Sequence, residues 1–414
     1  MSPPTSNDAP AESLRPFAGV FAVAMCGVCG FMDLYCTQPL LPMFVGLFHV
    51  SKSAAGLTVS ASTLGVALTA PIVGSYAERY NRKHIIVLSI LLLSIPTMLA
   101  ATAQGLGGLV FWRFLQGMLM PGIFAVTIAY ITEEWHENTV AVVMAFYVSG
   151  TVLGGFLGRL LSGLIAARYG WQMAFLALGA TNLAGGLLIA RWLPHSQGRA
   201  PIHAQAPRAD GTMGASLFRA VHHLKNGDLL VTFGVGFNIL FVLVATFTYV
   251  TFHLAAPPYS LSTASLSLLF SVYLVGLVAT PLGGILLTRI DLRSGILTAI
   301  LVSLFGVLLT LLHPLWTIVV GLALCCSGVF VAQAAAISHL RKAAPPGARV
   351  SAAGLYLSCY YVGGTAAGAV PAYAWKIGGW AGCVALTATV QLLTMAMVLI
   401  GWRKKAGVAR LETV

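Results

Sequence analysis

Long apolar stretches separated by short polar ones follow one another along the whole chain. Each stretch is about twenty or more residues long, which is the length that an α-helix needs to cross the hydrocarbon core of a bilayer. The pattern predicts twelve such helices, over residues 17–47, 54–76, 84–103, 107–131, 139–167, 171–193, 229–254, 263–288, 294–313, 315–340, 350–376 and 378–402. The predicted fold class is therefore an all-α integral membrane protein with twelve transmembrane helices.

The composition supports lipid as the solvent of this chain. Of the 414 residues, 58% are hydrophobic and only 8% are charged, and the mean hydropathy is +0.88. A soluble protein of this size could not bury so much apolar surface. Residues 1–16 are polar and rich in proline, without a basic start or a small-residue cleavage site, so the first apolar stretch is predicted to be a retained helix.

The basic residues are distributed unevenly between the two ends of the predicted helices. When the amino terminus is placed in the cytoplasm, most of the 23 Lys and Arg fall in cytoplasmic segments. Those on the external side are Lys52, Arg168 and Lys376, and those inside predicted helices, away from the helix ends, are Arg113 and Arg159. This asymmetry predicts that both termini are cytoplasmic. The net charge of +12 thus has a topological explanation, and nucleic acid is not expected as a partner.

The longest polar stretch divides the predicted helices six and six. The expected organisation is a cytoplasmic N-terminal tail (1–16), an N-terminal six-helix bundle (17–193), a cytoplasmic central linker (194–228), a C-terminal six-helix bundle (229–402) and a cytoplasmic C-terminal tail (403–414).

The two halves also repeat one another in sequence. TAPIVGSYAERYNRK (69–83) matches TPLGGILLTRIDLR (280–293), and FYVSGTVLG (146–154) matches YYVGGTAAG (360–368). Chance similarity among glycine-rich helices is the alternative explanation. A repeat of six-helix units in one orientation predicts two bundles around a central cavity, an arrangement suited to alternating access.

The loop GSYAERYNRK (74–83) resembles a motif of the major facilitator superfamily, G-x-L-A-D-R-x-G-R-K. The chain departs from that motif at Tyr76, Glu78 and Asn81. In the family the loop helps to set which side of the transporter is open. The resemblance therefore implies gating roles for Gly74, Glu78, Arg79, Arg82 and Lys83. Topology alone would explain the basic residues, but not the glycine or the acid.

Three further segments strengthen the resemblance. RFLQG (113–117) is similar to the R-x-x-x-G motif that the family uses near its proton site, and GTVLGGFLGR (150–159) is similar to its antiporter motif, G-x-x-x-G-P-x-x-G-G. The second segment has Gly155 in place of the proline and Arg159 in place of the final glycine. Together with LYCTQPLLPMF in the first helix, it resembles the YnfM-type branch of efflux transporters. This resemblance implies the major facilitator fold and exchange of a drug or metabolite for protons.

Three charged residues lie inside predicted helices and away from the helix ends: Asp33, Arg113 and Arg159. Each costs roughly 2.5 to 3.5 kcal/mol at the centre of a bilayer, so each should face the protein interior and find a partner. We predict that Asp33 pairs with Arg113 and couples transport to protons, because the proton affinity of a carboxylate depends on burial and on the distance of a cation. The pair resembles that of the superfamily's proton-coupled drug exporters. The alternative is an ion pair that only holds two helices together.

Helical geometry places Arg159 beside a face of small residues. Gly150, Gly154 and Gly158 recur every fourth residue and are predicted to pack against another helix. The neighbouring face can look into the cavity, where Arg159 would bind an anionic substrate group or pair with Asp33 or with helix-end carbonyls. The candidate substrate-binding residues are Arg159, Tyr35, Gln38, Tyr147, Tyr360 and Tyr361.

These features predict a secondary active transporter of the cell inner (plasma) membrane that exports a small organic molecule in exchange for protons. Its expected partners are that substrate, protons and membrane lipid, and one chain supplies both bundles, so a monomer suffices. Two buried arginines against one acid leave the alternatives of proton symport or of anion or carboxylate transport anchored on Arg159. A non-transporting membrane sensor is a more remote alternative.

Enzyme chemistry is not expected. No nucleophile and base pair and no metal cluster can be assembled from the predicted helices, and no nucleotide-binding lysine motif occurs. We therefore predict no cofactor and no metal. Cys26 and Cys29 form a CxxC, but it lies inside an apolar helix without a second pair, so helix packing is the expected role.

Overall fold

The computed structural model describes residues 9–76, 80–194, 226–344 and 349–402. These ranges are helical and contain no strand. The first half contains α1 (Ala9–Met32), η1 (Gln38–Leu40), α2 (Leu41–Phe48), α3 (Lys52–Tyr76), α4 (Arg82–Ala100), α5 (Leu106–Leu119), α6 (Pro121–Glu134), α7 (Glu137–Tyr169) and α8 (Trp171–Trp192). The second half contains α10 (Gly227–Ala255), α11 (Thr263–Leu269), η2 (Phe270–Val275), α12 (Gly276–Arg289), α13 (Leu292–Leu309), α14 (Leu315–Ala343), α15 (Arg349–Ala369) and α16 (Pro371–Gly401).

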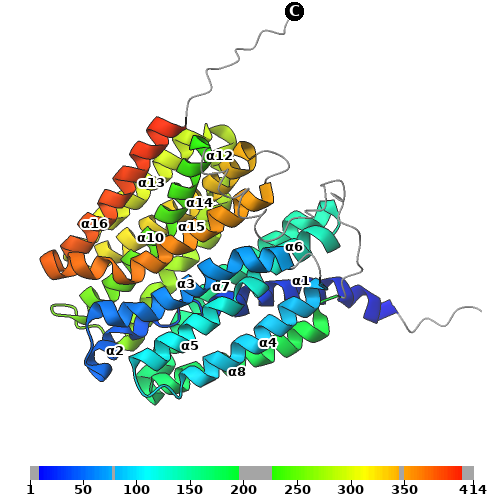
Figure 1. Cartoon of the computed structure of the whole chain (residues 1–414), viewed down its shortest axis with the longest axis horizontal. Coiled ribbons are helices and arrows are strands. Elements are labelled where there is room, and N and C mark those ends of the chain that lie inside the picture. Colours follow the sequence, from blue (N-terminus) through cyan, green and yellow to red (C-terminus); the bar gives the residue numbers. More distant parts are fainter. Residues whose placement is uncertain (1–8, 77–79, 195–225, 345–348, 403–414) are drawn as a thin grey trace, which may run out of the picture.

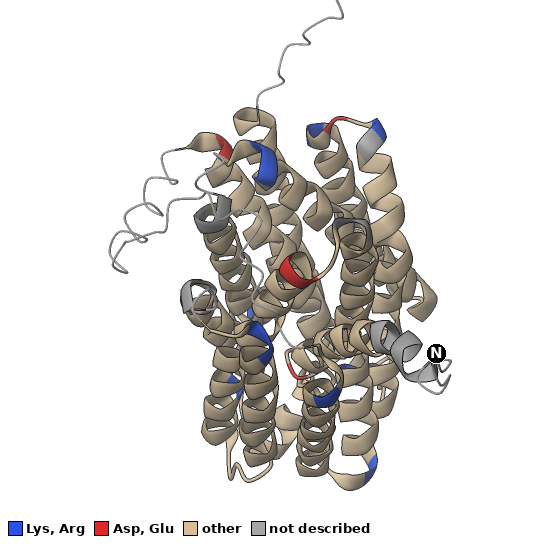
Figure 2. Ribbon diagram, turned by 90° about the vertical axis from the view of Figure 1, so that its right-hand side faces the viewer, with Lys and Arg blue, Asp and Glu red and all other residues tan. Residues whose placement is uncertain are grey.

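The described chain contains ten helical segments that are long and apolar enough to cross a membrane. Two further apolar helices, Ala18–Met32 and Gln38–Phe48, are shorter. Charged residues are sparse along the ribbon (Figure 2). The all-α membrane fold predicted from the apolar pattern is therefore confirmed at this level.

The first predicted helix, over residues 17–47, is broken in the structure. α1 ends at Met32, the chain turns through residues 33–37, and η1 and α2 follow. Each of these two elements has a proline in its first turn, Pro39 in η1 and Pro42 in α2. Proline has no N–H to donate to a preceding carbonyl, so a continuous helix was the wrong prediction here. We call residues 33–37 the helix break.

Other predicted helices are also interrupted or shifted, two of them at a proline. Pro121 begins α6 directly after α5, and a 3₁₀ segment, η2, separates α11 from α12. The helix predicted over 350–376 ends earlier, because Pro371 begins α16. α16 itself is kinked at Gly378 and Gly379, and the latter has a φ of +57° that favours glycine.

The helices form two groups that correspond to the two halves of the sequence (Figure 1). In the first group α1 packs along α7 and α4 along α8, and in the second α10 packs along α15 and α13 along α14. The groups meet chiefly where α3 lies along α15, and they diverge toward the ends that carry α6 and α12 (Figure 1).

The contact between the two groups is tightest at one end of the helices. A Cβ on Gly56 at the start of α3 would overlap the carbonyl oxygen of Gly368 at the end of α15. Close by, the Tyr249 hydroxyl donates to that same carbonyl at 2.8 Å. A Cβ on Gly163 of α7 would likewise overlap the side chain of Ser267 in α11. We call this region, where these residues meet, the joined end.

Candidate functional site

The helix break leaves backbone carbonyl groups without intrahelical partners, and side chains satisfy them. Arg113 Nη1 donates to the carbonyl oxygen of Asp33 at 2.7 Å, and Nη2 donates to that of Leu34 at 2.6 Å. The Ser162 hydroxyl donates to the carbonyl oxygen of Cys36 at 2.6 Å. Because an unpaired carbonyl is costly at membrane depth, these contacts make the interruption of the helix tolerable.

The remaining donors of Arg113 are also occupied. Nε donates to the carbonyl oxygen of Thr58 at 3.0 Å, and Nη2 also donates to the Ser62 hydroxyl at 2.9 Å. Nη1 donates a further bond to the side-chain oxygen of Gln116. All three nitrogens of the fully buried guanidinium thus have oxygen partners, which come from α3, α5 and the helix break.

The Asp33 carboxylate lies inside the first group of helices. Its Oδ2 accepts hydrogen bonds from the Thr97 hydroxyl on α4 at 2.6 Å and from Asn182 Nδ2 on α8 at 2.7 Å. Asp33 is fully buried, and neither its Oδ1 nor the Oδ1 of Asn182 has a partner among the described residues. The carboxylate therefore faces α4 and α8, with one oxygen unsatisfied.

The predicted pair of Asp33 and Arg113 is brought together, but through the backbone. The guanidinium binds the carbonyl oxygen of Asp33, and no ion pair joins it to the carboxylate within the described part of the chain. The direct ion pair expected from the sequence is therefore absent in this conformation. The reason is that the carboxylate turns toward Thr97 and Asn182, whereas the freed carbonyls of the helix break take up the guanidinium. A role in proton coupling stays a prediction.

Arg159 has a different set of partners. Its buried side chain donates from Nε to the Gln38 side-chain oxygen at 2.7 Å and from Nη1 to the carbonyl oxygen of Gly155, within α7, at 2.5 Å. Gln38 in turn donates to the Thr248 hydroxyl on α10 at 3.0 Å. Neither Asp33 nor a helix-end carbonyl is a partner of Arg159 in the described structure. The chain Arg159–Gln38–Thr248 instead joins the two groups of helices.

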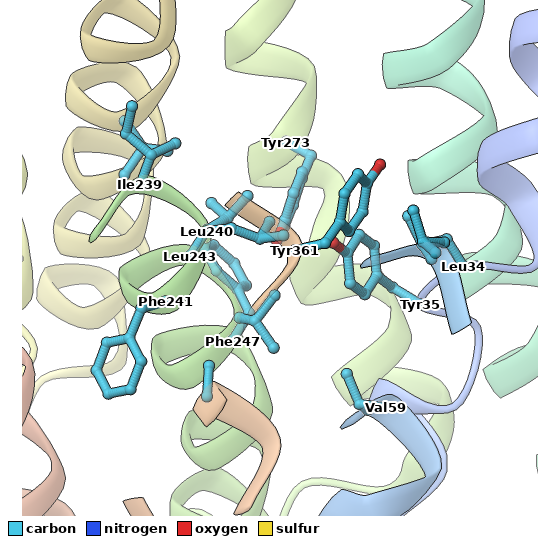
Figure 3. Packing of buried hydrophobic residues seen from close by; sticks show 14 of the residues in the cluster. Leu34, Tyr35, Val59, Ile239, Leu240, Phe241, Leu243, Phe247, Tyr273 and Tyr361 are labelled. Atoms are coloured by element: carbon cyan, nitrogen blue, oxygen red, sulfur yellow. The ribbon is translucent and has the colours of Figure 1, made fainter. Parts of the chain in front are cut away.

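Three aromatic rings surround the Arg159 guanidinium. Its central carbon lies 4.3 Å from the ring centre of Tyr273, 4.8 Å from that of Tyr35 and 5.1 Å from that of Phe270. Tyr35 belongs to the helix break, whereas Phe270 and Tyr273 belong to η2 in the second half. Tyr35 and Tyr273 thus reach the guanidinium from different halves, and both are labelled in Figure 3. Cation–π attraction thus offsets part of the cost of burying this charge.

The other tyrosines predicted to bind substrate are Tyr147, Tyr360 and Tyr361. The Tyr147 hydroxyl donates to the carbonyl oxygen of Phe124 at 3.2 Å, within the first half. The Phe124 ring stacks on Tyr361 of α15 with centroids 5.9 Å apart, and Tyr361 contacts Tyr360 edge to face at 5.2 Å. Tyr361 thus packs across the interface between the halves, and substrate binding by these tyrosines stays a prediction.

The glycine face of α7 packs directly on α1. A Cβ on any one of the three glycines would overlap a backbone carbonyl oxygen of α1, with the pairs being Gly150 and Ala24, Gly154 and Val28, and Gly158 and Met32. The small residues therefore let two backbones touch, which fixes the position of Arg159 one residue further along α7.

The predicted gating loop is only partly described. Glu78 and Arg79 lie outside the described residues. Gly74 lies in the last turn of α3, and Lys83 is buried in the first turn of α4. Arg82 forms a two-pronged ion pair, through Nε and Nη2, with Glu133 near the end of α6. The acid that meets Arg82 was not anticipated from the motif.

Several residues of the site were not anticipated from the sequence. Around Asp33 and Arg113 these are Thr97, Gln116 and Asn182, and around Arg159 they are Thr248, Phe270 and Tyr273. Amides are costly to bury without partners, so Gln116 and Asn182 inside apolar helices were available signals. A single threonine or an aromatic residue in a membrane helix carries no such signal.

The described residues contain no group of three or more His, Cys, Asp or Glu that could hold a metal ion. Cys26 and Cys29 are free and buried in α1.

Comparison with known proteins places the chain in a family. The profile described as Major Facilitator Superfamily matches residues 23–272. An uncharacterized transporter of Buchnera aphidicola subsp. Schizaphis graminum is 30% identical over 380 residues, which cover 92% of this chain and 90% of the relative. The inner membrane transport protein YnfM of Escherichia coli K12 is 32% identical over 382 residues, which cover 92% and 89%. The chain belongs to the major facilitator superfamily.

A solved structure shares the fold. The inward-facing, occupied structure of a bacterial homologue of the human lysosomal transporter Spinster superposes with a TM-score of 0.73 at 16% identity, covering 94% of this chain and 97% of that one. The protein is therefore a multi-pass transporter of the inner (plasma) membrane, and the resemblance to the YnfM-type branch is confirmed.

Proposed function

We propose that the protein exports a small organic molecule in exchange for protons by alternating access. In this proposal the chain crosses the membrane twelve times, six in each half, with both termini in the cytoplasm and the linker 194–228 between the halves. The broken first helix, α1 with η1 and α2, counts as one crossing. A single chain supplies both halves, so the transporting unit is a monomer.

The burial of Asp33 is the observation on which proton coupling rests. It is the one acid among the fully buried residues of the described chain, and one of its oxygens has no partner. An unpaired buried carboxylate oxygen is costly, and a proton on it removes much of that cost. Proton binding would change the bonds from Thr97 and Asn182, and because Asp33 belongs to the helix break it would also change the segment that carries Tyr35 and Gln38.

The joined end supports the proposal that this conformation is closed on the external side. With both termini in the cytoplasm, the start of α3 and the end of α15 face outward, so the contact of Gly56 with Gly368 closes the external side. Lys52, whose ammonium lies 5.1 Å from the ring centre of Trp375 in the second half, adds to the same closure. Opening outward would require these contacts to separate.

Proton release from the purified protein tests the exchange. We expect that a ligand drawn from a panel of organic acids and lipophilic cations releases protons in a weakly buffered detergent solution, and that Asp33→Asn binds the ligand without release. Asp228→Asn, which changes an exposed acid at the start of α10, is the matched control and should release protons normally. Ligand binding without release in the wild type would contradict proton coupling.

Transport of a carboxylate or other anion, by symport or exchange, is the second candidate. It is favoured by Arg159, which is buried at the interface of the halves and has no carboxylate partner among the described residues. Intact cells that produce the protein distinguish the directions. Cellular benzoate would fall if the anion is exported and rise if it is taken up.

A further inference from the structure

The Arg159 guanidinium has only neutral partners among the described residues. Its hydrogen bond to Gln38 has a neutral amide as acceptor, and Nη2 has no hydrogen-bond partner within the described residues. A carboxylate carries a charge of its own and can accept from two guanidinium nitrogens at once, whereas the amide oxygen of Gln38 is neutral and accepts from Nε alone. A carboxylate that reaches Arg159 would therefore displace the amide oxygen of Gln38.

The surroundings of Arg159 restrict the kind of molecule that could bring this carboxylate. Tyr35, Phe270 and Tyr273 provide ring faces and edges, which suit a flat apolar body. The Tyr273 hydroxyl is buried and has no partner in the described chain. It can donate to the second oxygen of a carboxylate, so that a buried donor and an unused donor of Arg159 are both satisfied.

Gln38 connects this site to the contact between the halves. Its oxygen accepts from Arg159 of the first half, and its nitrogen donates to Thr248 of the second. A side chain that loses its bond to Arg159 is no longer held in the position from which it reaches Thr248. Displacement of Gln38 would therefore remove a hydrogen bond that ties the halves together.

We propose that Arg159 and Tyr273 form a binding site for a monocarboxylate with a flat apolar body, and that the Gln38 side chain occupies the place of the carboxylate in the empty protein. This inference deepens the anion candidate above and rests on it. Gln38 is then a competitor of the substrate and a latch between the halves. Substrate binding opens the latch, which links occupancy of the site to separation of the two groups of helices.

Calorimetric titration of the purified full-length protein with benzoate tests the site. We expect benzoate to bind and its uncharged isostere benzamide not to bind. Arg159→Gln should weaken benzoate binding about tenfold or more, because it removes the charged, two-pronged hydrogen bond to the carboxylate. Gln38→Ala removes the competitor and should strengthen binding about threefold or more. Thr248→Val, which keeps the Arg159 bond but loosens the latch, should shift affinity in the same direction by less.

The sign of the Gln38→Ala effect decides the proposal. Weaker benzoate binding in Gln38→Ala would mean that Gln38 is a ligand of the substrate, which overturns its role as a placeholder. Absence of benzoate binding in both the wild type and Gln38→Ala, or equal binding of benzamide, would overturn the carboxylate site. The wild type and Gln38→Ala both keep Arg159, so a folding defect caused by replacing Arg159 does not affect this comparison.

The outcome is separable from that of proton coupling. Asp33→Asn should bind benzoate while losing proton release, because the carboxyl of Asp33 and the Arg159 site lie on different sides of the helix break. Failure of benzoate binding with proton-linked flux of other molecules intact would remove only the carboxylate site.

Discussion

Arg113 and Arg159 are two buried arginines of the same half, and their surroundings differ completely. Arg113 has an oxygen partner on each of its three nitrogens, and three of these partners are backbone carbonyls. Arg159 has one amide, one carbonyl of its own helix and the faces of three rings. Arg113 is thus bound mainly to the backbone, whereas the contacts of Arg159 are ones that a ligand could replace.

The difference shows that a buried charge does not by itself indicate function. The cost of burying Arg113 is met by carbonyls of the helix break and of α3, which accept from its guanidinium. Arg159 lies between the halves, where it contacts two rings of the second half. We therefore propose that Arg113 supports the structure of the helix break and that Arg159 serves binding and conformational change.

Replacement of Arg113 should have the largest effect. Arg113→Ala removes the charged donor from the carbonyls of Asp33, Leu34 and Thr58, and loss of each hydrogen bond from a charged group costs about 1.5 to 3 kcal/mol. At about 2 to 4 °C per kcal/mol, the melting midpoint in detergent should fall by about 10 °C. Differential scanning fluorimetry measures it, with Arg159→Ala as the matched variant. An equal fall in both would abolish the distinction between the two arginines.

Filling the glycine face should have the next largest effect. Gly158→Ala puts a methyl group against the carbonyl oxygen of Met32, whereas at Gly155 the nearest atom would be Arg159 Nη1, at 3.3 Å. Forcing an extra carbon into a tight contact costs about 1 to 3 kcal/mol, so Gly158→Ala should lower the melting midpoint by about 5 °C. Gly155→Ala should stay within about 2 °C of the wild type, since a flexible side chain can yield.

The packing of α7 on α1 does not hold Arg159 in place if these two variants behave alike. In that case the guanidinium would owe its position to its hydrogen bonds and rings only. The two arginines would then differ more clearly, because the position of Arg113 depends on backbone partners.

A lysine in place of each arginine compares the two sites directly. Lysine keeps the charge but lacks the planar fork and stacks less well on rings. Arg159→Lys should lower benzoate affinity about tenfold, or about 1.4 kcal/mol, while its melting midpoint changes by less than about 3 °C. Arg113→Lys should instead lower the midpoint and leave the affinity of the folded fraction unchanged. Titration and melting of both variants give the four values, and the reverse pattern would exchange the two assignments.

The sequence predicted the helices better than their interruptions. An apolar run of membrane length identifies a helix because the bilayer offers no water to an open backbone. The run over 17–47 stays apolar across the helix break, so hydropathy alone could not locate it, although Pro39 and Pro42 were visible. The shift of the last boundary to Pro371 has the same origin.

The polar network of the candidate site was predictable mainly on the side of the first half. Asp33, Gln38 and Arg159 could be named because polar groups are rare in apolar helices. Their partners Thr248 and Tyr273 could not, because the face that each presents depends on how one half lies against the other. The orientation of the Asp33 carboxylate toward Asn182 likewise depends on the packing of α1 on α8, which no local pattern contains.

The ion pair of Arg82 with Glu133 should have the smallest effect, because it lies near the surface. Their side chains are 13% and 27% exposed, and pairs of this kind contribute about 0 to 1 kcal/mol. Glu133→Gln should therefore lower the melting midpoint by no more than about 2 °C. About 0.5 M salt should erase that difference, since salt screens charges that water reaches. The effect of Arg113→Ala should persist in the same salt, because its partners are buried and uncharged. Salt sensitivity thus separates a charge that water reaches from a buried charge that binds the helix break. If the effect of Arg113→Ala depended on salt, the partners of Arg113 would not be those described.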